Sequence, residues 1–529
     1  MENTKKRVLC ISEFTGLSTG YARYGFELLS RLHASGKYEV FELAKYGVQP
    51  ADRDKLQNIP WKVCPVLPQN PEEEKVYNSS PTNQFGEWKF ESTCLDFLPD
   101  YVLEFSDPWM YNYQKESPFR NFFSWVLMPT LDACPQTSEW LETYQSADAL
   151  LTYNDWAYDV LRFSSNNFPQ LLGSAPPACP KEFVPLPDKQ KRKQAILGKD
   201  CIVIGTVMRN QPRKDFPGLF DAFAKLLADT KRTDIYLYCH TNYPDMGWNI
   251  PDLLKRTGIA NRVLFTYQCK NCKFVFPSVY QDIAMACPKC HGVAGTSSTR
   301  MPVSNSQLNE LYNLFDLYVQ ASFLEGFGIG QCEAAASGVP VISTDYSAMS
   351  DVIRKLGGYP LPVSRYTKEN TSGRLFAGTD QDSLVEYLKM FINLSSEQRE
   401  QLGEVARYNY NKHYNYDTTA KMWMRAIDST APKLDWKSPP RLFQPNTNVP
   451  QGLNNKDYVR WLILNVLGLP NRAYSLFEAK MVRDCAFNCT LGHGGAPQPF
   501  DRNMALQSCL GIRNKWNYWE NQRKLKFNL

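Results

Sequence analysis

The first part of the chain alternates between short apolar runs and amphipathic stretches. Residues 7–13 form an apolar run that predicts a strand, and residues 21–34 repeat their apolar positions at helical spacing. Residues 38–44 return to a strand pattern, so this region predicts a parallel β-α-β unit. Similar units follow, with strands predicted over residues 101–105, 124–128 and 149–153 and a helix from Asp155.

A proline-dense segment over residues 174–187 and the basic run 189–193 interrupt this pattern and predict a solvated linker. The α/β pattern then restarts. The predicted strands are 201–207, 235–239, 317–320 and 339–343, and the predicted helices are 216–227, 308–313 and 331–336. The fold class predicted is therefore α/β, with two doubly wound parallel-sheet (Rossmann-like) domains facing a cleft, over residues 1–190 and 196–427.

The chain ends in an extension, residues 428–529, which we expect to be mixed and mainly helical and to pack back on the first domain. Its last 28 residues, 502–529, hold six basic residues against the single acid Glu520, together with Trp516, Tyr518 and Trp519. Basic residues interleaved with aromatics can bind nucleic acid. A final helix that packs its aromatics inward is the favoured alternative.

Composition narrows the class of protein. With 529 residues, 43% hydrophobic and 13% aromatic, the chain can form packed cores, which excludes overall disorder. It contains no run of 18 apolar residues, so no spanning helix is predicted. The N-terminus lacks a signal-type apolar region, and we expect a cytoplasmic protein, in the host cytoplasm if it is viral. The odd number of cysteines, 15, argues against a disulfide framework.

The window from Glu325 to Glu333 predicts an anion-binding site. A strand is predicted to end near Ser322, and three glycines within five residues then allow a ligand to approach the backbone closely. A helix begins after them, and its free N–H groups favour a phosphate. Glu333 is expected in or near the first helical turn, where a carboxylate can accept hydrogen bonds from sugar hydroxyls. The alternative is a plain glycine-rich turn with a capping glutamate.

A second window, residues 205–215, also lies at a strand-to-helix junction. Its cations Arg209 and Lys214 follow the carboxyl end of a predicted strand, which is where open α/β sheets bind ligands. Both charges could stabilise a diphosphate leaving group, and a surface salt bridge is the alternative. The mild net charge of +5 fits an anionic ligand without requiring one.

These windows together resemble the GT-B glycosyltransferases of retaining family 4. The sequence EGFGIGQCE has that family's E-x7-E pattern, and Arg209 with Lys214 matches its basic pair. The resemblance covers the donor half, residues 196–426, and also points weakly to phage-type members. It implies a nucleoside-diphosphate sugar donor, with a UDP-sugar favoured. The residues it assigns to the donor are Gly16, Gly20, Arg209, Lys214, Glu325, Phe327, Gly328, Ile329 and Glu333.

The first domain matches the family more loosely. Gly16 and Gly20 lie in the loop after the first strand, but the tandem glycine of many members is missing. The histidine that many members place in this half of the cleft is also not evident, and Asp107 or Asp132, at the ends of predicted strands, could take its place. With Arg209, Lys214 and Glu325 these form the expected catalytic set. The family implies a front-face mechanism assisted by the donor phosphate, without a catalytic metal.

Four cysteines have the spacing of a metal site. Cys269, Cys272, Cys287 and Cys290 form C-x2-C-x14-C-x2-C, which predicts a structural zinc ion held by a ribbon over residues 266–294. The alternative is four unrelated thiols. The ribbon could bind nucleic acid, bind a partner or brace a loop, and bracing is the most common outcome. A weaker cluster, Cys485, Cys489 and His493, lacks a visible fourth ligand and is better explained by buried thiols.

The leading interpretation is a retaining glycosyltransferase whose acceptor is open. One alternative acceptor is a hydroxymethylated base in DNA, suggested by the tail and the ribbon. The other is a cell-envelope glycan, a lipid or a small molecule. An interpretation from a different class is a non-catalytic, zinc-containing binding protein that has kept the fold. The oligomeric state is not predicted.

Overall fold

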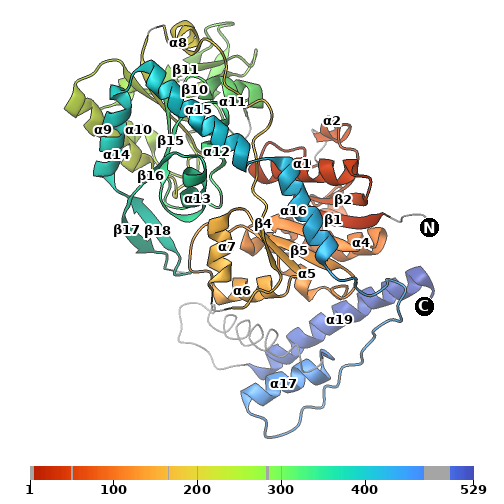
Figure 1. Ribbon diagram of the computed structural model, residues 1–529. Helices are drawn as coiled ribbons and strands as arrows, with labels where there is room; N and C mark the ends of the chain where they lie inside the picture. The colour runs from red at the N-terminus through yellow and green to blue at the C-terminus, as the bar shows by residue number, and fades with distance from the viewer. Residues whose placement is uncertain are drawn as a thin grey trace.

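Two α/β domains and a C-terminal extension make up the chain in the computed structural model (Figure 1). The structure describes residues 5–48, 52–164, 166–198, 200–281, 285–298, 301–370, 372–469 and 501–529. In this described part, no helix has the length and apolar character needed to cross a membrane.

The first domain is built on a seven-stranded parallel sheet in the order β3-β2-β1-β4-β5-β6-β7. Its central strands β4, β5 and β6 are buried along their whole length, because helices cover both faces of a parallel sheet. The strands are β1 Lys6–Glu13, β2 Tyr38–Lys45, β3 Lys62–Pro65, β4 Tyr101–Ser106, β5 Ser124–Pro129, β6 Ala149–Thr152 and β7 Leu171–Ser174. The helices are α1 Gly20–Ala34, α2 Arg53–Leu56, α3 Pro71–Tyr77, α4 Glu87–Phe97, α5 Tyr113–Glu116, α6 Ser138–Gln145 and α7 Asp155–Arg162, with 3-10 turns η2 Pro81–Phe85 and η3 Pro108–Met110.

The second domain contains a parallel sheet in the order β10-β9-β8-β14-β15-β16, extended beyond β10 by antiparallel strands β11 to β13. A separate hairpin, β17 with β18, stands beside it. The strands are β8 Ile202–Val207, β9 Ile235–His240, β10 Val263–Cys269, β11 Val275–Val279, β12 Met285–Ala286, β13 Val293–Thr296, β14 Leu317–Gln320, β15 Val341–Thr344, β16 Tyr359–Leu361, β17 Val363–Lys368 and β18 Leu375–Thr379. The helices are α8 Lys189–Leu197, α9 Phe216–Thr230, α10 Ile250–Thr257, α11 Asn305–Tyr312, α12 Ile329–Ala336, α13 Ser347–Lys355 and α14 Gln381–Asn393, with the 3-10 turn η4 Ala260–Arg262.

Two features between the domains differ from the sequence-based expectation. The basic run 189–193 lies in helix α8 rather than in a solvated linker, because buried Lys193 forms an ion pair with Asp316 at 2.8 Å.

Helix α15 (Ser396–His413) leads to α16 (Tyr416–Ser429), which packs on the first domain (Figure 1). There Trp423 Nε1 donates to Tyr24 Oη at 2.6 Å. The predicted end of the second domain, residue 427, therefore lies beyond the point where the chain returns to the first domain, since α16 already packs on that domain.

The extension contains α17 (Asn455–Asn465) and α19 (Arg502–Phe527), which pack against each other. Trp516 Nε1 donates to the carbonyl of Glu116 at 2.8 Å, and Trp519 lies against Phe119 of the first domain. Arg523 is fully buried and donates to the carbonyls of Trp436 and Ser438. Arg513, Trp516 and Arg523 of the tail are thus buried in the fold, as the inward-packing alternative describes, while Tyr518, Lys524 and Lys526 are exposed.

Candidate active site and metal centre

The reversal points of the two sheets mark the candidate site. In the first sheet the chain order reverses between β1 and β4, and in the second between β8 and β14. Open α/β sheets bind ligands outside the carboxyl ends of the strands at such a point. The loop after β1 carries Gly16 and Asp107 follows β4, whereas Lys214 follows β8 and Glu325 follows β14. The residues predicted separately along the chain therefore lie at two facing crevices.

Lys214 and Glu325 form a buried ion pair at the second of these crevices. Glu325 Oε1 also accepts from Gln320 Nε2 at 3.2 Å, and its backbone N–H donates to Ser347 Oγ at 3.0 Å. Burial lowers the pKa of Lys214 to about 8, against the opposing effect of Glu325. Burial alone would raise the pKa of Glu325, but Lys214 and the neighbouring Arg213 outweigh it and lower that pKa. The glutamate is therefore held as a carboxylate.

Arg209 lies at the surface of the same crevice and makes a two-pronged ion pair with Asp245. The distances are 2.9 Å from Nε to Oδ2 and 3.1 Å from Nη2 to Oδ1. The Arg209 side chain is 45% exposed, so an incoming anion can reach it. Asp245 lies on the loop after β9, and no sequence pattern singled it out.

Arg213 is a third cation of the site, which the sequence reasoning passed over although it adjoins Lys214. Its Nη2 lies 3.4 Å from Glu325 Oε2. Across the cleft, burial raises the pKa of both Asp107 and Asp132, and the charge of Arg213 opposes that increase. Arg213 therefore lies between the carboxylates of the two domains. Its direct sequence adjacency to Lys214 was the signal available for finding it.

The glycines after Glu325 allow the loop to touch the first domain and to turn into α12. A Cβ on Gly326 would lie 2.4 Å from Thr130 Cγ2, and the Gly326 carbonyl accepts from Asn154 Nδ2 at 3.0 Å. Gly328 has a φ of 80° and caps α12, which begins at Ile329. The Phe327 side chain is buried against Tyr414, with 5.8 Å between the ring centroids.

Glu333 lies just beyond the first turn of α12, because the helix begins at Ile329, two residues before the predicted start. Its buried carboxylate accepts from Tyr312 Oη at 2.8 Å and from Arg23 Nη1 of the first domain at 3.2 Å. Burial raises its pKa, against the opposing effect of Arg23. Arg23 also lines a cavity of about 780 Å³ between the domains, together with Thr15 and Leu17 of the loop after β1.

The loop after β1 is fixed by a buried carboxylate. Glu42 accepts from the backbone N–H and from the hydroxyl of Thr15, both at 2.8 Å, and from Trp61 Nε1 at 2.8 Å. Gly16 follows directly, and Gly20 is the first residue of α1, whose N-terminus opens toward this loop. The free N–H groups of such an end favour an anion.

Asp107 and Asp132 have different partners in the first domain. Asp107 Oδ1 accepts from Tyr21 Oη at 2.8 Å, and the same hydroxyl contacts Thr130 Oγ1 at 2.7 Å. Burial raises the pKa of Asp107 to about 6, and the charge of Asp132 contributes to the increase. Asp132 instead forms an ion pair with Arg374 beside β18 at 2.9 Å. Asp107 is thus held by a neutral hydroxyl, whereas Asp132 links the two domains.

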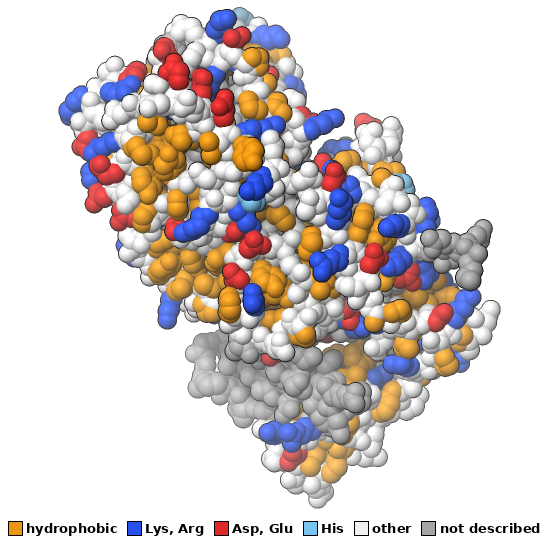
Figure 2. All heavy atoms as spheres, viewed as in Figure 1, with side chains coloured by type: hydrophobic (Ala, Val, Ile, Leu, Met, Phe, Trp, Pro, Cys, Tyr) orange, Lys and Arg blue, Asp and Glu red, His pale blue; other side chains and the backbone are white. Residues whose placement is uncertain are grey.

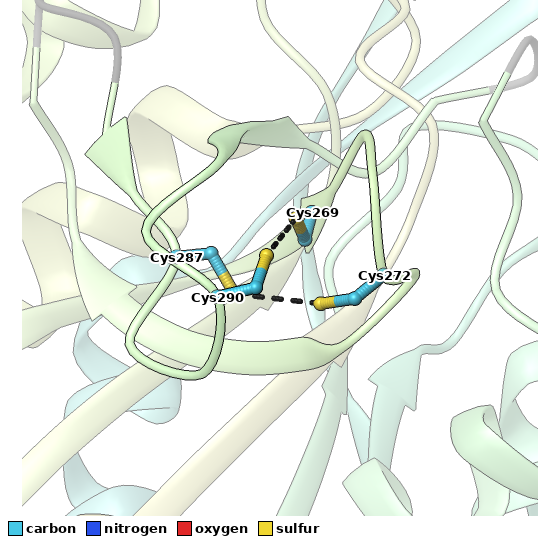
Figure 3. Close-up of side chains that lie close together, drawn as sticks. All are labelled: Cys269, Cys272, Cys287 and Cys290. Carbon is cyan, nitrogen blue, oxygen red and sulfur yellow. Dashed lines mark hydrogen bonds between the residues drawn. The ribbon is translucent and has the colours of Figure 1, made fainter.

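The four cysteines at 269, 272, 287 and 290 converge on one point (Figure 3). Their Sγ atoms all lie within 4.8 Å of one another, with 3.5 Å between Cys269 and Cys290 and 3.7 Å between Cys272 and Cys287. Backbone N–H groups of Cys272 and Asn271 stabilise the Cys269 thiolate and lower its pKa to about 6. Four thiols that surround one point fit the tetrahedral preference of zinc.

The two cysteine pairs have the same backbone form. The residue after each pair, Lys273 and His291, has a φ of 59°. The weaker cluster of Cys485, Cys489 and His493 lies outside the described residues.

Comparison with known proteins gives a partial sequence match. The family described as "Glycosyl transferases group 1" matches residues 299–408. The peptide N-acetylglucosaminyltransferase GtfA subunits, whose names give UDP-N-acetylglucosamine as donor, are 28% identical over 126 residues in Streptococcus parasanguinis and 30% identical over 117 in Streptococcus gordonii. These alignments span 23% and 22% of this chain. They span 23% and 21% of the relatives, so the chain matches less than a quarter of those proteins' length.

Solved structures match over most of the chain. Sucrose-phosphate synthase from Thermosynechococcus elongatus aligns with a TM-score of 0.57 and 15% identity, over 80% of this chain and 98% of that one. Anabaena Alr3699/HepE in complex with UDP and glucose aligns with a TM-score of 0.54 and 13% identity, over 80% and 100%. These likenesses show the fold: the chain has the GT-B architecture predicted from its sequence.

Proposed function

We propose that this protein transfers a sugar from a nucleoside-diphosphate sugar to a hydroxyl acceptor, with retention of configuration at the anomeric carbon. The observation that carries the proposal is the convergence of Arg209, Arg213 and Lys214 with Glu325 at the reversal point of the second sheet, facing Asp107. Cations beside a diphosphate and carboxylates beside sugar hydroxyls suit such a donor.

The residues divide between the two ends of the donor. Arg209 and Lys214 bind the diphosphate, and Lys214 exchanges part of its contact with Glu325 for a phosphate oxygen. Glu325 and the backbone of residues 326–329 bind the sugar. Glu333, already held by Tyr312 and Arg23, accepts from the ribose hydroxyls. Gly16 and Gly20 let the loop after β1 approach the phosphates.

The reaction needs charge compensation as the leaving group departs. The bond from C1 to the diphosphate oxygen breaks, and a bond from C1 to the acceptor oxygen forms on the same face. The acceptor's proton passes to the departing phosphate oxygen. Arg209, Arg213 and Lys214 stabilise the charge that develops on the diphosphate, which is the task a divalent metal performs elsewhere. Asp107 orients the acceptor hydroxyl, since among the described residues Tyr21 is the one side chain that donates to its carboxylate.

UDP is the nucleotide we favour. It is part of the donor named for the GtfA relatives, and it is the ligand named for the Alr3699/HepE structure. The cysteine cluster is proposed to hold one structural zinc ion, bound by Cys269, Cys272, Cys287 and Cys290.

The acceptor stays open between a hydroxymethylated base in DNA and a glycan, lipid or small molecule. The C-terminal tail supports DNA less than its composition suggests, because Arg513 and Arg523 are buried and Lys515 lies 3.5 Å from Glu91, whereas Lys524 and Lys526 are exposed. Basic and acidic side chains are interspersed on the face of the molecule in Figure 2. The exposed lysines of the ribbon, Lys270, Lys273 and Lys289, remain as support for a nucleic acid.

Mass spectrometry of donor consumption tests the proposal. A panel of UDP-, GDP- and ADP-sugars is incubated with the protein, alone and with hydroxymethylated DNA or with envelope glycans and lipids. We expect slow donor hydrolysis without acceptor and mass gain on one acceptor class. Lys214→Ala should abolish both, and Lys412→Ala, a surface change on α15, serves as the matched control. Absence of hydrolysis and of donor binding across the panel would leave the non-catalytic binding protein as the better interpretation.

A further inference from the structure

The cysteine ribbon, defined here as β11 to β13 with the end of β10, grows out of the sheet that carries the donor residues. β10 pairs in parallel with β9 through residues 263–265 and antiparallel with both β11 and β13. Its last residue is Cys269, the first cysteine of the cluster. The ribbon therefore begins at the carboxyl end of β10, which is the end of the sheet where the loops after β8 and β9 also lie.

The ribbon contacts the loop that follows β9, residues 241–249. Thr296 Oγ1 of β13 donates to the carbonyl of Tyr243 at 3.4 Å. The Tyr243 ring lies edge-on to Tyr280 of the ribbon, with 6.2 Å between ring centroids. Tyr280 in turn packs on Phe265 of β10 at 5.8 Å. One side of the loop is thus supported by the ribbon.

The other side of this loop holds the segment that carries the donor-phosphate cations. Trp248 exchanges two hydrogen bonds with Asn210: its N–H donates to Asn210 Oδ1 at 2.8 Å and its carbonyl accepts from Nδ2 at 2.9 Å. Its indole Nε1 donates to the carbonyl of Lys214 at 2.6 Å. Asp245 binds the Arg209 guanidinium with both oxygens. One loop therefore binds the guanidinium of Arg209 and the main chain at Lys214.

Gly247 makes this close contact possible. A Cβ at this position would lie 2.4 Å from Asn210 Oδ1 and 2.7 Å from the backbone carbon of Asn210. A Cβ atom does not approach other heavy atoms that closely, so the loop can lie against residues 210–211 only because residue 247 has no side chain. A shift of the loop would therefore also displace residue 210 and its neighbour Arg209.

We propose that the ribbon is a positioning device for the donor-phosphate cations. It holds the loop 241–249 through Thr296 and Tyr280, and Asp245 and Trp248 on that loop hold Arg209 and Lys214. The inference rests on the proposed function, because it gives the ribbon a part in binding a nucleoside diphosphate. Tyr243, Asp245 and Trp248 are positioning residues in this scheme and need not touch the donor.

Calorimetric titration of the full chain with UDP and with UMP tests the inference. Thr296→Val with Tyr280→Leu removes the contacts to the loop but leaves all four cysteines in place. We expect about tenfold weaker UDP binding, because misplaced cations lose the second phosphate, with a smaller loss for UMP. Zinc content, measured by atomic absorption, should stay at one per chain. Lys289→Ala, on the ribbon but away from the loop, is the matched control and should bind UDP as the wild type does.

A second variant, Cys272→Ser with Cys290→Ser, removes the metal and should give the same selective loss for UDP. If Thr296→Val with Tyr280→Leu keeps wild-type UDP affinity, or loses UDP and UMP equally, the inference is overturned while the proposed function stands. If the wild type binds no nucleoside diphosphate at all, the proposed function fails first and the inference fails with it.

Discussion

At the residue scale, the site depends on charges that are buried and paired. Lys214 and Glu325 lie in the protein interior, where an unpaired charge would be costly. Pairing stabilises both charges in the interior. Burial lowers the pKa of Lys214 to about 8 although Glu325 opposes this, so a bound anion can shift its protonation near neutral pH. Removing either partner leaves the other without its main contact.

Lys214→Ala should therefore lower donor turnover by about a hundredfold or more, because a cation on the leaving diphosphate is lost. Zinc content should remain at one per chain, because Cys269, Cys272, Cys287 and Cys290 supply the ligands and Lys214 supplies none. Donor hydrolysis and metal analysis on the same sample check both statements. A simultaneous loss of zinc would mean that Lys214 is needed for the fold of the ribbon as well as for donor turnover.

Asp107 gives a pH-dependent prediction. Its folded pKa, about 6, lies above the ordinary value of 3.8, so the folded state disfavours its ionisation. The protonated carboxyl of Asp107 therefore contributes fully to the free energy of unfolding below about pH 4, and this contribution is lost as the pH rises through 6. Asp107→Asn should accordingly raise the free energy of unfolding at pH 8 by up to about 3 kcal/mol and change it little at pH 3.5. Denaturant titrations at both pH values measure this.

The same variant should lose transfer to the acceptor, since the amide no longer accepts the acceptor's hydrogen bond as a carboxylate does. In the wild type, kcat/KM for the acceptor should rise with pH through about 6 as Asp107 ionises. Rate profiles with saturating donor would reveal this limb. A profile that Asp107→Asn leaves unchanged would remove Asp107 from the reaction.

At the element scale, helix α19 shows why a basic tail need not bind nucleic acid. Arg523 lies on its buried face and donates to the carbonyls of Trp436 and Ser438 and to Glu520 at 2.8 Å. Trp436 in turn stacks on Phe122 of the first domain. The helix therefore holds the irregular segment after α16 against the first sheet.

Arg523→Ala should destabilise the protein by about 3 kcal/mol, because Glu520 and the carbonyls of Trp436, Ser438 and Pro439 lose their donor. Lys524→Ala, next to it on the exposed face, should be neutral within about 0.5 kcal/mol. Thermal melting of both variants makes the comparison. Equal effects would show that α19 is not packed as described.

At the scale of the whole molecule, ion pairs hold the two domains against each other. Asp132 contacts Arg374 at 2.9 Å, and Arg23 contacts Glu333 at 3.2 Å, each pair joining one domain to the other. Gly326 lies against Thr130 in the same region. The cleft is thus narrow around the predicted sugar position.

Arg374→Ala should loosen this closed arrangement. We expect a larger radius of gyration by small-angle X-ray scattering in the absence of donor, and a partial return when UDP is added. Asp132→Ala should act in the same direction but less, because Arg374 also lies over the ring of Trp140 in the first domain, 5.5 Å from its centroid. The double variant should be no worse than Arg374→Ala, since the ion pair is already lost in that variant. Unchanged scattering in all three would show that other contacts are sufficient for closure.

The sequence by itself determined the two-sheet architecture, the glycine-rich window, the cations and the cysteine spacing. These features depend on local periodicity and on residues close along the chain. It missed Asp245 and the partners of Asp107, and it set the second domain's end too late, because α16 crosses to the other sheet.

Only the tertiary structure decided which charges meet. Arg23 and Glu333 are 310 positions apart, and Asp132 and Arg374 are 242 apart, so no local pattern could pair them. It also decided that Arg513, Trp516 and Arg523 of the tail pack inward, since burial depends on the surface against which a helix face packs. The link from the ribbon to Arg209 likewise depends on loops that follow different strands and meet at the carboxyl ends of those strands. The order of strands in the sheet, and not their separation in the sequence, brings these loops together.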